Sequence, residues 1–227
     1  MKTSVEIKNI AKETIGLELD AISKMKERIG DSFVNAIQLI LASKGRLIVA
    51  GIGKSANIAN KMVATFNSTG QPAIFLHAAD AIHGDLGNIQ PDDVVICISK
   101  SGNTSEIKAL LPFMKGSGNS LIALTGNMNS FLAKESNIVL DVSVEKEACP
   151  NNLAPTSSTT AQLVMGDAIA VSLLACKDFT DKDFARFHPG GTLGKRLYLK
   201  VSDILSKEST PSVSITSTIN EVIIEIS

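Results

Sequence analysis

Five short runs of apolar residues, separated by stretches with a helical pattern, constrain the fold of this chain more than any other feature. The runs lie at 47–50, 73–76, 94–98, 121–124 and 138–142. Short apolar runs of this kind are typical of strands that are buried on both faces. Helical stretches near 55–68, 104–116 and 129–135 lie between several of them. The order βαβαβ predicts an α/β fold, with a doubly wound, mainly parallel five-stranded sheet flanked by helices.

Further helices are expected outside this alternation. Residues 4–29 carry apolar side chains mostly three or four positions apart, which is typical of an amphipathic helix and predicts an N-terminal helical extension. A second helix is expected from about 31 to 43. A long helix near 157–177 is apolar on more than one side, so we expect it to close the domain against the sheet.

The balance of charge and composition excludes several classes of partner. The chain has 22 Lys and Arg against 23 Asp and Glu, and aromatic residues make up only 4%, so it lacks both the basic excess and the stacking residues of a nucleic-acid binder. Three widely spaced cysteines fit neither a zinc knuckle nor a redox pair and favour a reducing compartment. No segment reaches about 18 uninterrupted apolar residues, and charges run through the first 30 residues. We therefore expect a cytoplasmic protein that spans no membrane.

The first glycine-containing loop, Gly51-Ile52-Gly53-Lys54-Ser55-Ala56, follows a predicted strand and opens a helix, as a dinucleotide-binding loop does. A dinucleotide fold would place Asp or Glu at the end of the second strand, but that strand ends at His77. The same residues imitate the end of an ATP-binding P-loop, yet Ile48 stands where that loop requires glycine. The loop favours neither NAD nor ATP, and no cofactor is expected.

A second polar loop, Ser99-Lys100-Ser101-Gly102-Asn103-Thr104, follows the third strand and runs into the next helix. Hydroxyl groups, a glycine that allows close backbone approach and a helix N-terminus together make a site for a phosphate monoester. The carboxyl end of a central parallel strand is also where open α/β sheets bind ligands. The alternative is a Ser or Thr that caps the helix in an ordinary turn. The crowding of hydroxyl residues at one strand end favours phosphate.

These loops, together with three further segments, resemble the SIS-domain family of phosphosugar-binding proteins. The segments are His83-Gly84-Asp85-Leu86-Gly87, the stretch from Ala148 to Thr160, and His188-Pro189-Gly190-Gly191 with the following Leu193-Gly194. Within that family they resemble the branch that isomerises D-arabinose 5-phosphate. The resemblance covers residues 1 to about 200 and implies a SIS isomerase domain over residues 1–199.

Residues 200–227 resemble the opening of a CBS unit, which in that family forms a regulatory pair after the isomerase domain. Segments at 201–205, 211–213 and 219–224 predict one turn, one strand and one short helix, which is too little for a separate core. We expect a truncated CBS-like fragment that packs on the main domain or begins a second one, without the regulation that a complete pair provides.

The resemblance implies an aldose–ketose isomerase that interconverts D-ribulose 5-phosphate and D-arabinose 5-phosphate and feeds Kdo biosynthesis for lipopolysaccharide or capsule. Two alternatives remain open, a SIS module that binds a sugar phosphate without chemistry and an isomerase of another phosphosugar. The catalytic residues that the resemblance implicates are Lys54, Glu106, Glu147 and His188, and His83 is added because it lies in a glycine-flanked motif segment. The expected substrate-binding residues are Gly53, Ser55, His77, Ser99, Ser101, Gly102, Asn103, Thr104, Ser157 and Thr159.

Such an isomerisation needs a base that moves a proton between C1 and C2 and a donor that polarises the carbonyl group. Glu147 is the favoured base, because Glu106 lies about one turn into the phosphate-binding helix, where it can instead orient Lys54. His188 or His83 is expected to move a hydroxyl proton during ring opening, since histidine titrates near neutral pH. Two histidines without a clear third ligand make a weak metal site, so no metal is expected.

The apolar surface of the two long helices exceeds what one small sheet can cover, so a homodimer or homotetramer is expected. In such an assembly, His83 or His188 would reach the site of a neighbouring copy. A feedback ligand that competes at the active site is also expected, with CMP-Kdo as the candidate, because the site already accepts an anionic sugar.

Overall fold

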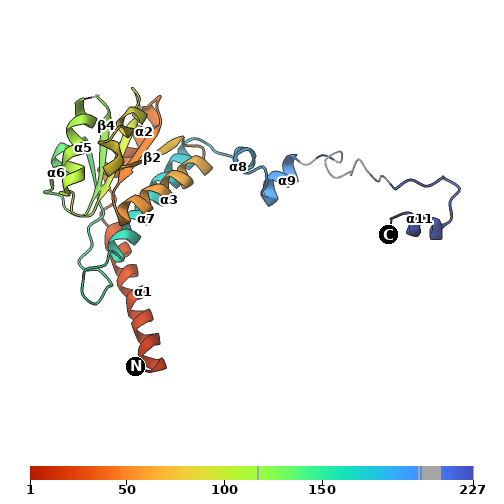
Figure 1. The fold of residues 1–227 in the computed structure, drawn as a ribbon, viewed down its shortest axis with the longest axis horizontal. Helices are drawn as coiled ribbons and strands as arrows, with labels where there is room; N and C mark the ends of the chain where they lie inside the picture. The colour runs from red at the N-terminus through yellow and green to blue at the C-terminus, as the bar shows by residue number, and fades with distance from the viewer. Residues whose placement is uncertain (117, 199, 201–210, 227) are drawn as a thin grey trace. The chain divides into compact units, whose positions relative to one another are not determined.

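A computed structural model describes residues 1–116, 118–198, 200 and 211–226 of this chain (Figure 1). It consists of two compact units, Met1–Phe179 and Thr180–Ser227. The first unit ends earlier than the SIS domain predicted for residues 1–199, and that longer boundary stays a prediction.

The first unit contains a five-stranded sheet with the strand order β2-β1-β3-β4-β5, and every strand pair in it is parallel. The strands are β1 (Leu47–Gly51), β2 (Ala73–His77), β3 (Val94–Ser99), β4 (Ser120–Thr125) and β5 (Ile138–Asp141). Within one or two residues these are the apolar runs of the sequence, so the predicted parallel α/β fold is confirmed.

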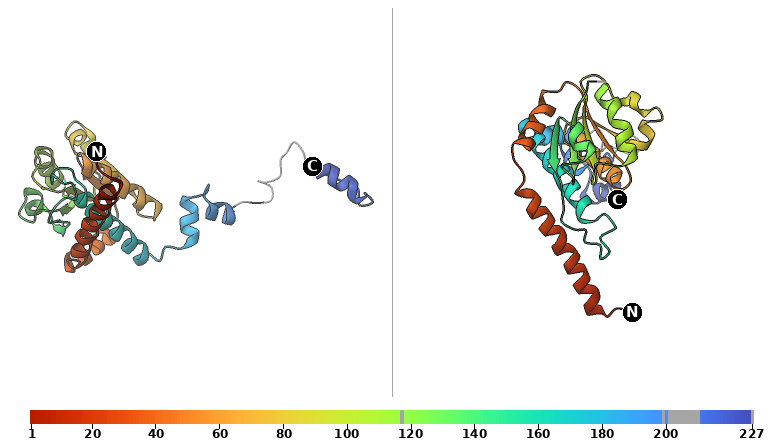
Figure 2. Two further views of the ribbon diagram at one scale, coloured as in Figure 1. Left: turned by 90° about the horizontal axis from the view of Figure 1, so that it is seen from below. Right: turned by 90° about the vertical axis from the view of Figure 1, so that its left-hand side faces the viewer.

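Helices cover both faces of the sheet, as Figure 2 shows. The longer ones are α1 (Ser4–Lys26), α2 (Asp31–Ala42), α3 (Lys54–Ser68), α5 (Ser105–Gly116) and α7 (Ser157–Cys176). Three are short: α4 (Ala78–Ala81) and the 3-10 turn η1 (Asp85–Asn88), which the sequence analysis did not predict, and α6 (Phe131–Glu135), which confirms the helix predicted near 129–135. The amphipathic pattern predicted the N-terminal helix to within three residues, and the two ends of α7 to within one.

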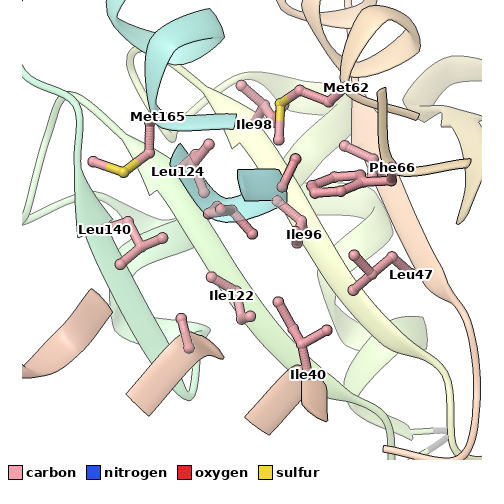
Figure 3. Close-up of a cluster of buried hydrophobic side chains, with 14 of the residues drawn as sticks. Ile40, Leu47, Met62, Phe66, Ile96, Ile98, Ile122, Leu124, Leu140 and Met165 are labelled. Carbon is pink, nitrogen blue, oxygen red and sulfur yellow. The ribbon is translucent and has the colours of Figure 1, made fainter. Parts of the chain in front are cut away.

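The core is divided between the two faces because successive side chains of a strand point in opposite directions. In β1, Leu47 and Val49 pack with α2, α3 and α7, whereas Ile48 and Ala50 pack with α4 and α5. Figure 3 shows the first of these clusters, in which Met62 of α3 and other helix side chains point toward the strands. Burial on both faces explains why the strands read as continuous apolar runs rather than as alternating ones.

Helix α7 is, within the part of the chain that the structure describes, the one helix long and apolar enough to cross a membrane. It packs against α1 and α3, and Ala161, Met165, Ile169 and Leu173 are buried in the core. A Cβ atom on Gly166 would lie 2.4 Å from the Met62 side chain, so this glycine allows the close approach of α3. The burial of this side of α7 accounts for part of its apolar composition, while Val171 of the same helix is 61% exposed.

The second unit contains α8 (Asp181–Phe187), α9 (Thr192–Tyr198) and α11 (Ile219–Ile226). Helix α11 confirms the predicted short helix near 219–224. The turn predicted at 201–205 lies outside the described residues. The strand predicted at 211–213 is wrong, since these residues are irregular and pair with no strand among the described residues. A strand forms only where a neighbour accepts its backbone hydrogen bonds.

Candidate active site

Parallel pairing brings the carboxyl ends of all five strands to one edge of the sheet. Gly51, the last residue of β1, lies beside His77 of β2 and Ile98 of β3. Ser99 of β3 lies beside Thr125 of β4. Helices α3 and α5 begin after β1 and β3, so their N-termini start at this edge. The two polar loops of the sequence therefore meet in space, as open α/β sheets require of a ligand site.

A cleft of about 270 Å³ opens at this edge. It is bounded by the first residues of α3, the loop after β3, and the first turn of α7. Its lining residues are Ile52, Lys54, Ser55, Ile98, Ser99, Lys100, Ser101, Thr104, Pro155, Ser158, Thr159 and Gln162. Three helix N-termini thus border one small space, and the partial positive charge at any of them that has no acidic cap favours an anion there.

The first loop turns on Gly53, whose backbone angles (φ +59°, ψ −128°) lie in a region that a residue with a Cβ avoids. This conformation starts α3 directly at Lys54, and no side chain caps the helix. Lys54 is exposed, and Ser55 is half-buried with its hydroxyl 3.2 Å from Oε1 of Gln162 on α7. The loop therefore presents an ammonium group and a hydroxyl group to the cleft.

The second loop is held by its own polar side chains. The Gly102 N–H donates to Ser99 Oγ at 3.1 Å, and the Asn103 N–H donates to Ser101 Oγ at 3.3 Å. Asn103 Oδ1 accepts the Phe131 N–H at 2.9 Å, which ties the loop to α6. Asn103 thus holds the loop in shape and does not line the cleft, and its role in substrate binding stays a prediction.

Thr104 differs from its neighbours in this loop. It lines the cleft, and its Oγ1 atom is buried with no hydrogen-bond partner among the residues that the structure describes. An ordinary N-cap would accept a backbone N–H of α5, so the capping alternative fails for this residue. A buried hydroxyl without a partner costs about 1–3 kcal/mol, which a bound oxyanion would remove.

Glu147 is the most constrained charge near the cleft. Its side chain is 0% exposed, and Lys100 Nζ lies 2.5 Å from Oε1. Ser158 Oγ donates to Oε1 at 2.5 Å, while the Thr156 and Ser158 N–H groups donate to Oε2 at 2.8 and 3.1 Å. Burial by itself raises the pKa of this carboxyl, but the hydrogen bonds from Lys100, Ser158 and Thr156 outweigh it and lower the pKa to about 2. Glu147 is therefore ionised, and it caps the N-terminus of α7.

Several other predicted residues lie away from the lining of the cleft. Glu106 is half-buried near the start of α5 and accepts a hydrogen bond from Ser105 Oγ at 3.0 Å. No ion pair joins it to Lys54 in the described part of the chain, so the predicted orienting contact is absent there. His83 is exposed in the turn after α4. His77 Nδ1 lies 3.4 Å from Asp80 Oδ2.

Two substrate-binding residues of the prediction are buried beside the cleft and do not line it. Gly102 has φ +63°, and a Cβ atom there would lie 2.2 Å from Ser130 Oγ and 2.9 Å from Thr125 Oγ1. Ser157 is fully buried, and its Oγ has no partner within the described residues. Both residues therefore pack beneath the residues that line the cleft.

His188 lies in the second unit, at the end of α8. Its ring stacks on Phe184 with centroids 4.0 Å apart, and Nδ1 is 2.9 Å from the Phe184 carbonyl oxygen. Since a carbonyl only accepts, Nδ1 carries the hydrogen and Nε2 is left to accept a proton in the neutral ring. This tautomer suits proton transfer.

The described residues contain no group of three or more His, Cys, Asp or Glu side chains placed to hold a metal ion.

The sequence analysis missed three polar residues that line the cleft: Lys100, Ser158 and Gln162. Lys100 stood unremarked between the two predicted serines. Ser158 and Gln162 are four residues apart on α7 and therefore share one helix face, where they interrupt an otherwise apolar pattern. Polar side chains at that spacing, in the first turns of a buried helix, were the available signal.

Comparisons with known proteins agree with this geometry. The model of the SIS domain family matches residues 40–172. Over its full length the chain is 50% identical to the arabinose 5-phosphate isomerase KdsD of Pseudomonas aeruginosa, of which it covers 70%. This chain belongs to the SIS-domain family of arabinose 5-phosphate isomerases.

A further relative and a solved structure are also similar to this chain. A probable arabinose 5-phosphate isomerase of Haemophilus influenzae is 52% identical over 86% of this chain, which spans 58% of that relative. Among solved structures, the c3406 protein of E. coli CFT073, in complex with arabinose 5-phosphate, is 40% identical with a TM-score of 0.80. It covers 83% of this chain, and this chain covers all of it.

Replacement of Gly102 by alanine tests how tightly this arabinose 5-phosphate isomerase fixes its second loop. The positive φ and the contacts with Ser130 and Thr125 predict a loss of about 2–4 kcal/mol in the free energy of unfolding. Denaturant unfolding measures it. Gly16→Ala is the matched control, because Gly16 lies in α1 with no atom within 4 Å of the added Cβ, and this variant should be neutral or slightly stabilised. Equal stability of the two variants would contradict the assigned packing.

Proposed function

We propose that the cleft binds a sugar phosphate and interconverts D-arabinose 5-phosphate and D-ribulose 5-phosphate, as the names of the relatives suggest. The observation that carries this proposal is the convergence of the N-termini of α3 and α5 on a cleft in which a buried threonine hydroxyl, Thr104 Oγ1, lacks a partner within the described residues. Such a site is suited to a phosphate monoester. The reaction supplies arabinose 5-phosphate for Kdo biosynthesis, and it takes place in the cytoplasm.

The phosphate lies against the second loop. Thr104 Oγ1 and the first N–H groups of α5 donate to its oxygens, and the Lys54 ammonium faces it across the cleft. In these loop contacts the Ser99 and Ser101 oxygens act as acceptors of backbone N–H groups, so their hydroxyl hydrogens are available to donate to the phosphate. Since the phosphate is the same in aldose and ketose, these contacts bind both equally and act mainly on KM.

The isomerising proton transfer belongs to Glu147, although its carboxylate is engaged in the structure. Among the described groups that donate hydrogen bonds to Glu147, the Lys100 ammonium is the one best placed to move. The Lys100 side chain lines the cleft and is 48% exposed. A substrate carbonyl or enediolate oxygen draws this ammonium away and is polarised by it. Loss of that hydrogen bond raises the pKa of Glu147 and leaves Oε1 to take the proton. Glu106 remains the competing base.

Ring opening precedes isomerisation in one direction only. Arabinose 5-phosphate can close to a furanose, whereas the ketose cannot because its C5 oxygen is esterified. His188 or His83 moves the hydroxyl proton in this step, and the His188 tautomer, with Nε2 able to accept, supports that role.

Incubation of the wild-type protein with D-ribulose 5-phosphate tests the activity, and we expect an aldose to form.

A comparison of Glu147→Gln with Glu106→Gln tests which carboxylate is the base. We expect Glu147→Gln to lower kcat by roughly 100-fold or more and to stop the exchange of the C2 proton, which NMR in deuterated water measures. Glu145→Gln is the control, since Glu145 is 74% exposed and pairs with Lys24. If only Glu106→Gln abolishes exchange, the two carboxylates exchange roles. No conversion by the wild-type protein favours the regulatory or other-sugar alternative.

The chain also assembles as a homodimer or homotetramer. Helix α1 projects from the rest of its unit in the right-hand view of Figure 2, and Val5, Ile7, Ile15 and Leu19 are 58–67% exposed on it. A helix with this much exposed apolar surface is stabilised by burial against a neighbouring copy. Assembly also allows His83 or His188 of one copy to reach the site of another.

Analytical ultracentrifugation tests the assembly. We expect a sedimentation coefficient of a dimer or tetramer, and we expect Ile15→Glu combined with Leu19→Glu to shift it toward the monomer, because charge at these positions opposes burial. A fully active monomeric wild-type protein would contradict the proposal.

CMP-Kdo is proposed as a feedback ligand that competes at the same cleft. Its carboxylate and phosphate suit the ammonium of Lys54 and the loop from Ser99 to Thr104. Initial-rate kinetics should show that it raises the apparent KM for arabinose 5-phosphate and leaves kcat unchanged, with no such effect from CMP alone. Unchanged rates at millimolar CMP-Kdo would refute it.

A further inference from the structure

We propose that Gln162 of α7 binds a hydroxyl group of the sugar and so selects the sugar part of the ligand, separately from the phosphate. The inference rests on the proposed function, because it assigns one more residue to the same cleft. It depends on three observations, the burial of this amide, its single hydrogen bond, and its position in the lining.

Gln162 is fully buried within a helix that otherwise turns apolar residues to the core. Buried amides are nearly always paired at both the carbonyl and the amino end. Here the Ser55 hydroxyl lies 3.2 Å from Oε1, whereas Nε2 has no hydrogen-bond partner in the part of the chain that the structure describes. Nearby Met165, one turn along α7, packs into the apolar core instead.

A small polar group in the cleft could form a hydrogen bond with the unpaired Nε2 end of the Gln162 amide. Gln162 lines the cleft together with Thr104, the other buried group there without a partner. Thr104 belongs to the loop after β3 and Gln162 to the second turn of α7, so the two residues approach the cleft from different elements. With the phosphate at Thr104, the amide is left for the carbon chain of the sugar.

A hydroxyl group fits this position better than a charged group. An amide carries no net charge, and a sugar hydroxyl can donate or accept, so it pairs with the unpaired end whichever way the amide is turned. Ser55 holds the other end of the amide, which fixes the side chain before the ligand arrives. A fixed partner discriminates strongly, because a ligand that lacks the hydroxyl leaves a buried amide unpaired.

The test is the affinity of Gln162→Met for two ligands measured by calorimetry. Methionine keeps the length of the side chain and removes its hydrogen bonds. D-arabinitol 5-phosphate carries the hydroxyls and the phosphate but cannot isomerise, and inorganic phosphate carries only the anion. We expect the variant to bind D-arabinitol 5-phosphate about 10–100-fold more weakly and inorganic phosphate within about twofold of wild type.

Gln71→Met is the matched control. Gln71 is also buried, but Lys177 Nζ donates to its Oε1 at 2.6 Å and its Nε2 donates to the Pro72 carbonyl, next to the start of β2 and at the opposite edge of the sheet. This control should lose thermal stability and keep both affinities. Gln162→Met should keep or raise the Tm of the unliganded protein, since it removes an unpaired buried amide.

The outcomes separate the two proposals. If Gln162→Met binds D-arabinitol 5-phosphate as wild type does, or loses affinity for inorganic phosphate to the same extent, the assignment of Gln162 is wrong. A fall in Tm with unchanged affinity shows a structural amide and also overturns it. If the wild-type protein fails to bind D-arabinitol 5-phosphate at all, the proposed function fails first.

Discussion

The parallel pairing of five strands governs where everything else in the first unit lies. Because all strands run in one direction, Gly51, Ser99 and Thr125 end at the same edge of the sheet, and the helices that follow begin there. The first N–H groups of a helix have no partner within the helix and carry partial positive charge, and at α7 they donate to Glu147. The position of a cleft for an anion thus follows from the topology of the backbone, and the polar side chains add hydrogen-bonding groups at that position.

Glu147 is the one full negative charge buried at this edge among the described residues, and it stabilises the fold there. It caps α7 through the Thr156 and Ser158 N–H groups and reaches the β3 loop through Lys100. Because its pKa in the folded chain is lower than in the unfolded chain, this stabilisation is present above about pH 4.5 and is lost as the pH falls toward 2. In the proposed mechanism, a ligand that displaces Lys100 would release this carboxylate to act as the base, which would couple proton transfer to substrate binding.

The loop after β3 shows how far single residues can be assigned from a motif. The cluster of hydroxyl groups was predicted as a phosphate site, and in the structure the residues of this loop make different contacts. Ser99 and Ser101 accept N–H groups of the loop itself, Asn103 holds α6, and Thr104 keeps an unpaired buried oxygen within the described part of the chain. Residues that shape a binding loop and residues that touch its ligand share the same composition, so sequence alone does not separate them.

The sequence by itself determined the strands, the long helices and the two polar loops, because hydrophobic periodicity and glycine placement are local properties. Only the tertiary structure decided that the first turns of α7 join those loops, since Ser158 and Gln162 lie more than fifty residues further along the chain than Thr104. It also decided that Glu147 is buried against Lys100, 47 residues away. Burial and unpaired hydrogen-bonding groups arise only when distant segments pack together, and they distinguish a ligand contact from a structural one.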